Sequence, residues 1–211
     1  MAAKEFIVLD NANARRSAAR FIDPVARLML RLKVTPDGIT WFGCGATIFI
    51  SVVFLAQGNF LIGAILFGAF GLIALLDGTM ARMLGTAGPW GAFLDSTLDR
   101  ISDAAVICAL IYFYVNADSS NSQLAVIAGI VSLVMSLMTS YARAKAESLD
   151  AKCTVGIAER AERNLLIWVA LLISALVTDV MPYALAALAI LSTVTVIQRI
   201  LFVRKQLVIK A

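Results

Sequence analysis

The chain has 211 residues, a formal net charge of +4 and a hydrophobic content of 61%, with a mean hydropathy of +0.88. Soluble domains are about 45–50% apolar, so this excess excludes a single soluble core and indicates a protein that crosses the membrane several times. Histidine is absent, and the three cysteines have no CxxC spacing, which argues against a zinc site or a disulfide framework. Any metal must therefore be a hard cation held by carboxylates.

The N-terminal segment, about residues 12–34, is predicted to form an amphipathic helix. Arginines and Lys33 alternate with apolar side chains at helical spacing: Phe21, Ile22, Val25, Leu28, Met29 and Leu32. This pattern is typical of a helix that lies in the headgroup plane, and the alternative is a helix that packs on the rest of the protein. The first 35 residues lack the apolar run of a signal peptide, so we expect none.

Six apolar segments follow, and most approach the roughly 20 residues that a helix needs to cross hydrocarbon. They are Thr40–Ala56, Phe60–Met80, Trp90–Val115, Leu124–Ala142, Leu165–Val177 and Tyr183–Phe202. Backbone polar groups must be satisfied within the lipid, so all six are predicted to be helices. We therefore expect an all-α membrane protein of one domain, residues 1–211, with a six-helix bundle over about residues 40–206.

The connections between these segments differ in charge. Gln57–Asn59, Asn116–Gln123 and Thr178–Pro182 contain no Lys or Arg, and all basic residues lie in or near the other connections and the two ends. By the positive-inside rule, the termini and the basic connections are expected in the cytoplasm.

Three aspartates lie near the cytoplasmic ends of the second and third segments. Asp95 and Asp99 are four residues apart and share a helix face, which Asp103 continues, while Asp77 lies on the preceding helix. A single aspartate here would be a solvated helix end, but three facing one another repel unless a cation compensates them. Oxygen ligands favour Mg²⁺ or Mn²⁺ with substrate phosphates, so the cluster indicates phosphoryl transfer at a membrane surface.

The stretch DGTMAR, eight further residues and then GAFLDSTLD resembles the signature of the CDP-alcohol phosphotransferases, D-x-x-D-G-x-x-A-R followed by G-x-x-x-D-x-x-x-D. The resemblance implies two divalent cations, with Asp77, Asp95 and Asp99 as ligands and Asp99 also as the catalytic base. It implies CDP-diacylglycerol as the lipid substrate, with Gly78, Arg82 and Gly91 against the nucleotide and Asp37 and Thr40 as weaker candidates. One position departs from the signature, since Ala74 stands where the family has its first aspartate.

Three arginines at or just within the ends of apolar segments, Arg143, Arg163 and Arg199, indicate an anionic acceptor, most simply a phosphate. The stretches around them resemble the actinobacterial phosphatidylinositol-phosphate synthases of that family. This implies inositol 1-phosphate as acceptor and a bacterial plasma membrane as location. Phosphatidylglycerophosphate synthesis from glycerol 3-phosphate is the alternative.

Small residues allow a homodimer, and no nucleic-acid partner is expected.

Two further readings compete with this enzyme. A transporter would also hold aspartates within the membrane, but such folds usually show inverted repeats and midplane sites, and no repeat is evident. A non-catalytic homologue or disabled variant is the second alternative, because Ala74 removes a ligand.

Overall fold

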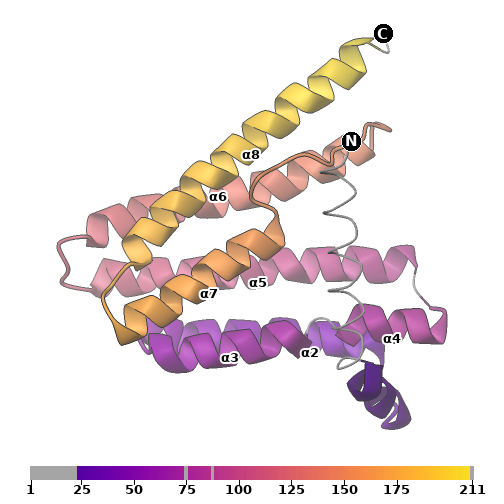
Figure 1. Cartoon of the computed structure of the whole chain (residues 1–211), viewed down its shortest axis with the longest axis horizontal. Helices are drawn as coiled ribbons and strands as arrows, with labels where there is room; N and C mark the ends of the chain where they lie inside the picture. Colours follow the sequence, from indigo (N-terminus) through magenta and orange to yellow (C-terminus); the bar gives the residue numbers. More distant parts are fainter. Residues whose placement is uncertain (1–22, 74–75, 87, 210–211) are drawn as a thin grey trace, which may run out of the picture. The chain divides into compact units, whose positions relative to one another are not determined.

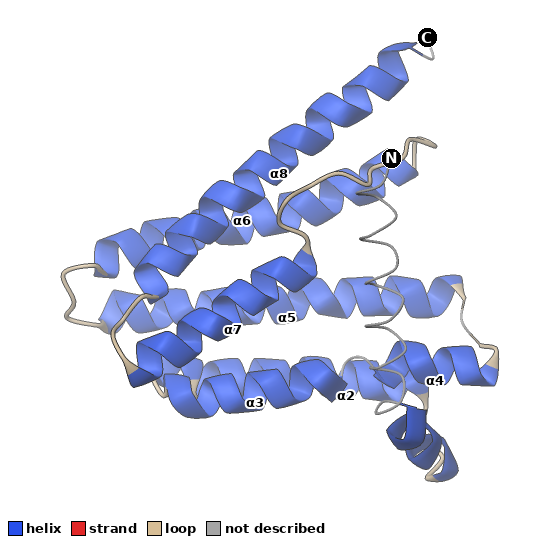
Figure 2. Ribbon diagram, in the orientation of Figure 1, coloured by secondary structure: helices blue, strands red, loops and turns tan. Residues whose placement is uncertain are grey.

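The structure is a computed structural model that describes residues 23–73, 76–86 and 88–209, and all regular elements in these ranges are helical (Figure 2). A helical segment over residues 23–31 comes first. The other elements are α2 (Pro36–Val53), a 3₁₀ turn (Leu55–Gln57), α3 (Phe60–Ile73), α4 (Leu76–Leu84), α5 (Pro89–Asn116), α6 (Ser122–Glu147), α7 (Arg160–Leu176) and α8 (Met181–Ile209). The all-α prediction is confirmed for the described residues.

Four helical stretches are long and apolar enough to cross a membrane: Pro36–Gln57, Phe60–Leu84, Ser122–Glu147 and Met181–Val208. They support an integral membrane protein, as predicted. The other two predicted spans lie on α5 and α7. The first half of α5 carries several charges, and α7 has only 17 residues. Length and composition therefore assign four spans where the sequence pattern predicts six.

The chain forms two compact units, Met1–Ala46 with Ala69–Asp99 (unit 1) and Thr47–Gly68 with Arg100–Ala211 (unit 2). Helices α2, α3 and α5 each contribute residues to both units. Each unit is described by itself below, and the single domain expected over residues 1–211 stays a prediction.

In unit 1, the segment over residues 23–31 packs one side against α2 and α4. Ala26 is buried in a cluster with Ile39, Leu76 and Met80. A second row of apolar side chains, Val25, Leu28 and Leu32, is 41%, 52% and 63% exposed. One side of this segment thus packs on the protein, while another side leaves apolar side chains exposed. Its location in the headgroup plane stays a prediction. Residues 12–22 of the predicted amphipathic helix lie outside the described residues.

In unit 2, α6 and α8 pack against each other and α7 packs against α8 (Figure 1). Small residues permit close approach between other helices of this unit: a Cβ on Gly129 of α6 would lie 2.6 Å from Ile111 of α5, and one on Gly68 of α3 would lie 2.7 Å from Trp168 of α7. Two polar side chains within the apolar core donate to backbone carbonyls. Trp168 Nε1 donates to the Ala64 carbonyl at 2.9 Å, and Ser132 Oγ donates to that of Leu185 at 2.9 Å.

Candidate functional site

Unit 1 contains the three predicted metal ligands, and hydrogen bonds define the position of Asp77. Asp77 lies in the first turn of α4, where the helix dipole favours a negative charge. Its Oδ2 accepts a hydrogen bond from Thr40 Oγ1 at 2.9 Å, and its Oδ1 accepts one from the Gly78 amide. Thr40 of α2 therefore orients a carboxylate of α4, which connects two predicted site residues directly.

Two glycines of unit 1 leave space beside this helix end. Among the described atoms, a Cβ on Gly78 would meet only Arg82 Nη1, at 3.5 Å, and one on Gly91 would meet nothing within 4 Å. Among the described residues, packing does not explain glycine at either position, and the space beside each is open to a ligand. Arg82 is exposed, and its Nη2 donates to Thr79 Oγ1 at 3.0 Å, so its guanidinium is held at the same helix.

The remaining predicted residues of unit 1 lie on α2 and α5. Asp37 Oδ2 accepts a hydrogen bond from Trp90 Nε1 at 2.9 Å, which joins the first turns of α2 and α5. Asp95 is exposed and Asp99 is half-buried, one helical turn apart on α5. Ala74, where the fourth acidic residue is expected, lies outside the described residues.

The donor chemistry of unit 1 suits a hard divalent cation, because the candidates are carboxylates and Asp77 is already oriented by Thr40. In the part of the chain that the structure describes, however, no three His, Cys, Asp or Glu side chains lie close enough together to hold a metal ion. The residues thus fit the ion in chemical type but do not form a complete ligand cluster.

Unit 2 contains the three predicted acceptor-binding arginines, and Arg163 is held by a carboxylate. Arg163 is 5% exposed and its Nη2 lies 3.3 Å from Asp103 Oδ2, while its Nη1 donates to the Ala158 carbonyl at 3.2 Å. The second oxygen of Asp103 accepts from Arg160 Nε at 3.3 Å. One carboxylate on α5 therefore orders two arginines at the start of α7.

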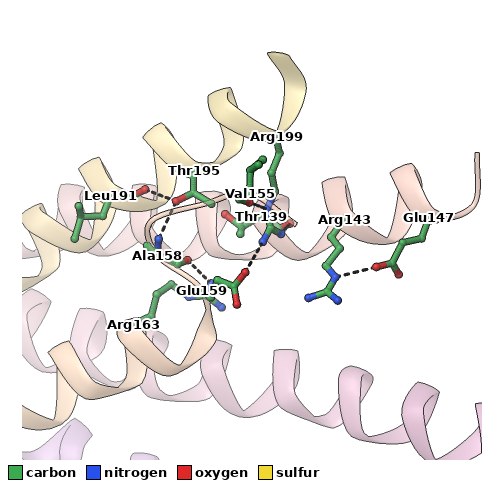
Figure 3. Close-up of polar contacts among 10 residues, drawn as sticks. All are labelled: Thr139, Arg143, Glu147, Val155, Ala158, Glu159, Arg163, Leu191, Thr195 and Arg199. Atoms are coloured by element: carbon green, nitrogen blue, oxygen red, sulfur yellow. Dashed lines mark hydrogen bonds and ion pairs between the residues drawn. The ribbon is translucent and has the colours of Figure 1, made fainter. Parts of the chain in front are cut away.

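Arg199 on α8 holds the connection between α6 and α7. It is 3% exposed, and its guanidinium donates from Nε to the Val155 carbonyl at 2.9 Å and from Nη1 to the Thr139 carbonyl. Its Nη2 lies 3.8 Å from Glu159 Oε1, a longer contact (Figure 3). Two of its nitrogens thus have a structural role, and Nη2 is the group best placed to exchange Glu159 for another anion.

The same connection is fixed to α8 at other points. The Ala158 amide donates to Thr195 Oγ1 at 3.1 Å, and Gly156, with a φ of +144°, passes so close that a Cβ would lie 2.6 Å from Thr195. Further along, Gln206 accepts from the Lys152 amide at 3.0 Å and donates to the Lys152 carbonyl at 2.6 Å. The connection is therefore an ordered part of unit 2.

Arg163 and Arg199 converge on neighbouring residues, Ala158 and Glu159 (Figure 3). Arg143 lies one turn after Thr139 on α6, is exposed, and pairs through Nε with Glu147 Oε1 at 2.9 Å. The structure thus brings two of the three predicted arginines together and places the third one turn beyond an Arg199 contact.

Sequence reasoning missed the roles of Asp103 and Glu159. Asp103 is visible in the sequence as the continuation of the Asp95 and Asp99 face, but its pairing with arginines 57 and 60 residues away has no local signal. Glu159 lies in a stretch of charged residues, so nothing in the sequence distinguishes it from an ordinary surface acid.

The model of the family described as CDP-alcohol phosphatidyltransferase matches residues 33–198 of the chain. The chain belongs to the CDP-alcohol phosphatidyltransferase family. It is therefore a member of a family of transferases, and the resemblance seen in the aspartate and glycine spacing is confirmed.

A phosphatidylinositol phosphate synthase of Cutibacterium acnes is 38% identical over 200 residues, which are 90% of this chain and 96% of that protein. An archaetidylinositol phosphate synthase of Methanothermobacter thermautotrophicus is 39% identical over 189 residues, 89% of this chain and 91% of that protein.

Solved structures agree with these relatives. The phosphatidylinositol phosphate synthase of Mycobacterium tuberculosis with CDP-DAG bound superposes with a TM-score of 0.82 at 34% identity, over 88% of this chain and 94% of that one. The same enzyme in complex with manganese and citrate gives 0.81 at 33% identity, over 86% and 88%. This chain thus shares the fold of a phosphatidylinositol phosphate synthase that has been solved with CDP-DAG and with manganese and citrate.

Proposed function

We propose that this chain transfers the phosphatidyl group of CDP-diacylglycerol to inositol 1-phosphate, giving phosphatidylinositol phosphate and CMP. The observation that carries the proposal is the 38% identity to a phosphatidylinositol phosphate synthase across 90% of this chain and 96% of that enzyme. The ordered arginines of unit 2 support an anionic acceptor, because buried guanidinium groups are suited to phosphate.

In this reaction the acceptor hydroxyl oxygen attacks the phosphorus that carries diacylglycerol. A new P–O bond forms, the bond from that phosphorus to CMP breaks, and the hydroxyl proton passes to a carboxylate oxygen of Asp99. General-base action of this kind typically contributes about 10²–10⁴-fold. Arg163, Arg199 and Arg143 are proposed to hold the acceptor phosphate, and the phosphate would replace Glu159 as the partner of Arg199 Nη2.

The lipid donor is proposed to bind in unit 1. Gly78 and Gly91 leave room for the nucleotide, and exposed Arg82 contacts its phosphates. Asp37 and Thr40 position neighbouring groups of the same pocket through Trp90 and Asp77. Mg²⁺ or Mn²⁺, held by Asp77, Asp95 and Asp99, would neutralise charge on the diphosphate. The family's expected pair of cations has fewer ligands here because of Ala74.

The finer topology is also a proposal. Six spans result if α5 and α7 cross the membrane as well, since the 28 residues of α5 extend about 42 Å. Basic residues at the ends of α6 and α8 support the proposal that the termini and the site lie in the cytoplasm of a bacterial cell. A homodimer remains part of the proposal, as small residues on several helices permit close packing.

A CMP-release assay tests the acceptor. Purified chain in vesicles with CDP-diacylglycerol is offered inositol 1-phosphate, glycerol 3-phosphate or free inositol. Release with inositol 1-phosphate alone supports the proposal. Release with glycerol 3-phosphate alone would favour phosphatidylglycerophosphate synthesis. The A74D variant is assayed in parallel, so that low activity from the missing carboxylate is distinguished from a wrong acceptor.

A further inference from the structure

Unit 2 has a cavity of about 440 Å³ between the C-terminal parts of α6 and α8. Met138, Tyr141 and Ala142 line it from α6, and Val196, Ile200 and Val203 line it from α8. Along each helix these residues recur at spacings of three, four or seven, so each helix presents one apolar face to the cavity. This lining is unsuited to a sugar phosphate or a nucleotide.

Two cationic side chains complete the lining. Lys145 and Arg204 are exposed and lie near the ends of two candidate spans, Ser122–Glu147 and Met181–Val208. Among the described residues, neither is ion-paired with a carboxylate. Arg199 also lines the cavity, but its guanidinium donates to the Val155 and Thr139 carbonyls. Lys145 and Arg204 therefore supply the available positive charge.

We propose that this cavity between α6 and α8, called the groove below, binds an anionic phospholipid of the surrounding bilayer. An acyl chain lies along the apolar lining, and the lipid phosphate lies against Lys145 and Arg204. Basic pockets between membrane helices bind anionic headgroups in this way, because tail and headgroup are matched at the same time. Arg199 lines this cavity and is also one of the proposed acceptor arginines. The lipid phosphate is nevertheless assigned to Lys145 and Arg204, and neither of these belongs to the acceptor arginines.

Charge decides between a lipid and a second copy of the chain as the occupant. The chain has a net charge of +4, and a copy that docked its own α6 and α8 ends here would bring further cations to Lys145 and Arg204. An anionic lipid brings the opposite charge, and its acyl chain also covers the apolar lining of the groove.

Native mass spectrometry of the full-length chain in detergent tests the proposal. Phosphatidylglycerol and phosphatidylcholine with identical acyl chains are titrated without CDP-diacylglycerol or acceptor, so the result does not depend on the proposed reaction. We expect phosphatidylglycerol to bind roughly tenfold more tightly, and K145Q/R204Q to remove this preference. The matched control is K152Q/K205Q, which neutralises two exposed lysines outside the groove.

A second variant tests whether the apolar lining of the groove binds the acyl chain. Ala142→Phe fills the groove and should weaken retention of both lipids severalfold, while millimolar glycerol 3-phosphate should displace neither. Equal binding of both lipids by the parent chain would overturn the proposal, as would an equal loss in the control pair. If Ala142→Phe or K145Q/R204Q instead converted a dimer to a monomer with unchanged lipid binding, the groove would be an interface between copies.

Discussion

Asp103 of α5 and Arg163 of α7 form a largely buried ion pair, with Nη2 of Arg163 3.3 Å from Oδ2 of Asp103 and side-chain exposures of 5% and 13%. The second carboxylate oxygen binds Arg160. Removing one partner of a buried pair typically costs about 3–5 kcal/mol, because the other charge is left uncompensated. The pair therefore sets the orientation of Arg163 and stabilises the contact between α5 and α7.

Asp103→Asn should raise the KM for inositol 1-phosphate severalfold while leaving that for CDP-diacylglycerol nearly unchanged. Asparagine keeps the shape but loses the charge that fixes Arg163. Steady-state CMP release measures both constants, and Asp103→Glu, which keeps the charge, should recover part of the loss. Asp118→Asn, which changes an exposed acid on the connection between α5 and α6, is the matched control. Equal changes in both constants would show that Asp103 only stabilises the fold.

Arg163→Gln should raise the KM for the phosphorylated acceptor by about 10- to 100-fold. The estimate follows from the roughly 1.5–3 kcal/mol of a hydrogen bond to a charged group. Arg160→Gln should have a smaller effect, because Arg160 shares the same carboxylate but its side chain is 37% exposed. If Arg160 and Arg163 variants behaved alike, the buried guanidinium would have no special role in acceptor binding.

Arg199→Lys should loosen the connection over residues 148–159 without unfolding the helices. Lysine keeps the charge but cannot donate in the fixed fork geometry that reaches both Val155 and Thr139. Hydrogen–deuterium exchange should show faster exchange in peptides of this connection and unchanged protection in α6. Arg204→Lys, on the same helix, should leave the connection unaffected.

Asp99→Asn should abolish CMP release while retaining CDP-diacylglycerol binding. The amide keeps the size of the carboxylate but cannot take the acceptor proton. Lipid binding is measured separately, by titration with a fluorescent CDP-diacylglycerol. Substantial turnover in the asparagine variant would remove Asp99 from the role of base.

Ala74→Asp should raise CMP release by orders of magnitude at fixed Mg²⁺. Residue 74 precedes Asp77 by three positions, and a carboxylate there would add a ligand to the set that Asp77 and Asp95 begin. High Mg²⁺ should rescue the alanine form only partly, because occupancy can be restored but geometry cannot. Ala74→Asn, which adds a neutral side chain of similar size, is the control. Equal rates with alanine and aspartate would show that the existing carboxylates suffice.

The helical elements were predictable because hydrophobic length and the hydrogen-bonding needs of a backbone in lipid leave few choices. Whether α5 crosses the membrane is less clear from the same rule, because the first half of α5 carries several charges and only its second half is strongly apolar. The family was predictable from the spacing of Asp77, Gly78, Arg82 and the aspartates of α5. Such spacing is local information, since it lies on two consecutive helices.

Long-range pairing was not predictable. The sequence pattern suggested three converging arginines, but Arg199 uses two nitrogens on backbone carbonyls of a connection that has no regular structure. Every residue has a backbone carbonyl, so the sequence does not show which carbonyl an arginine will bind. A buried arginine that binds phosphate therefore cannot be distinguished in the sequence from one that holds a loop in place. The oriented Thr40–Asp77 contact was likewise invisible, because 37 residues separate its members.

Gln206 has a consequence for the order in which the protein matures. Its amide pairs with both the N–H and the C=O of Lys152, 54 residues earlier, as a neighbouring strand would. During synthesis the chain emerges from its N-terminus, so the connection between α6 and α7 leaves the ribosome well before its partner exists. The arginines around that connection can therefore reach their final arrangement only after translation of the last helix is nearly complete.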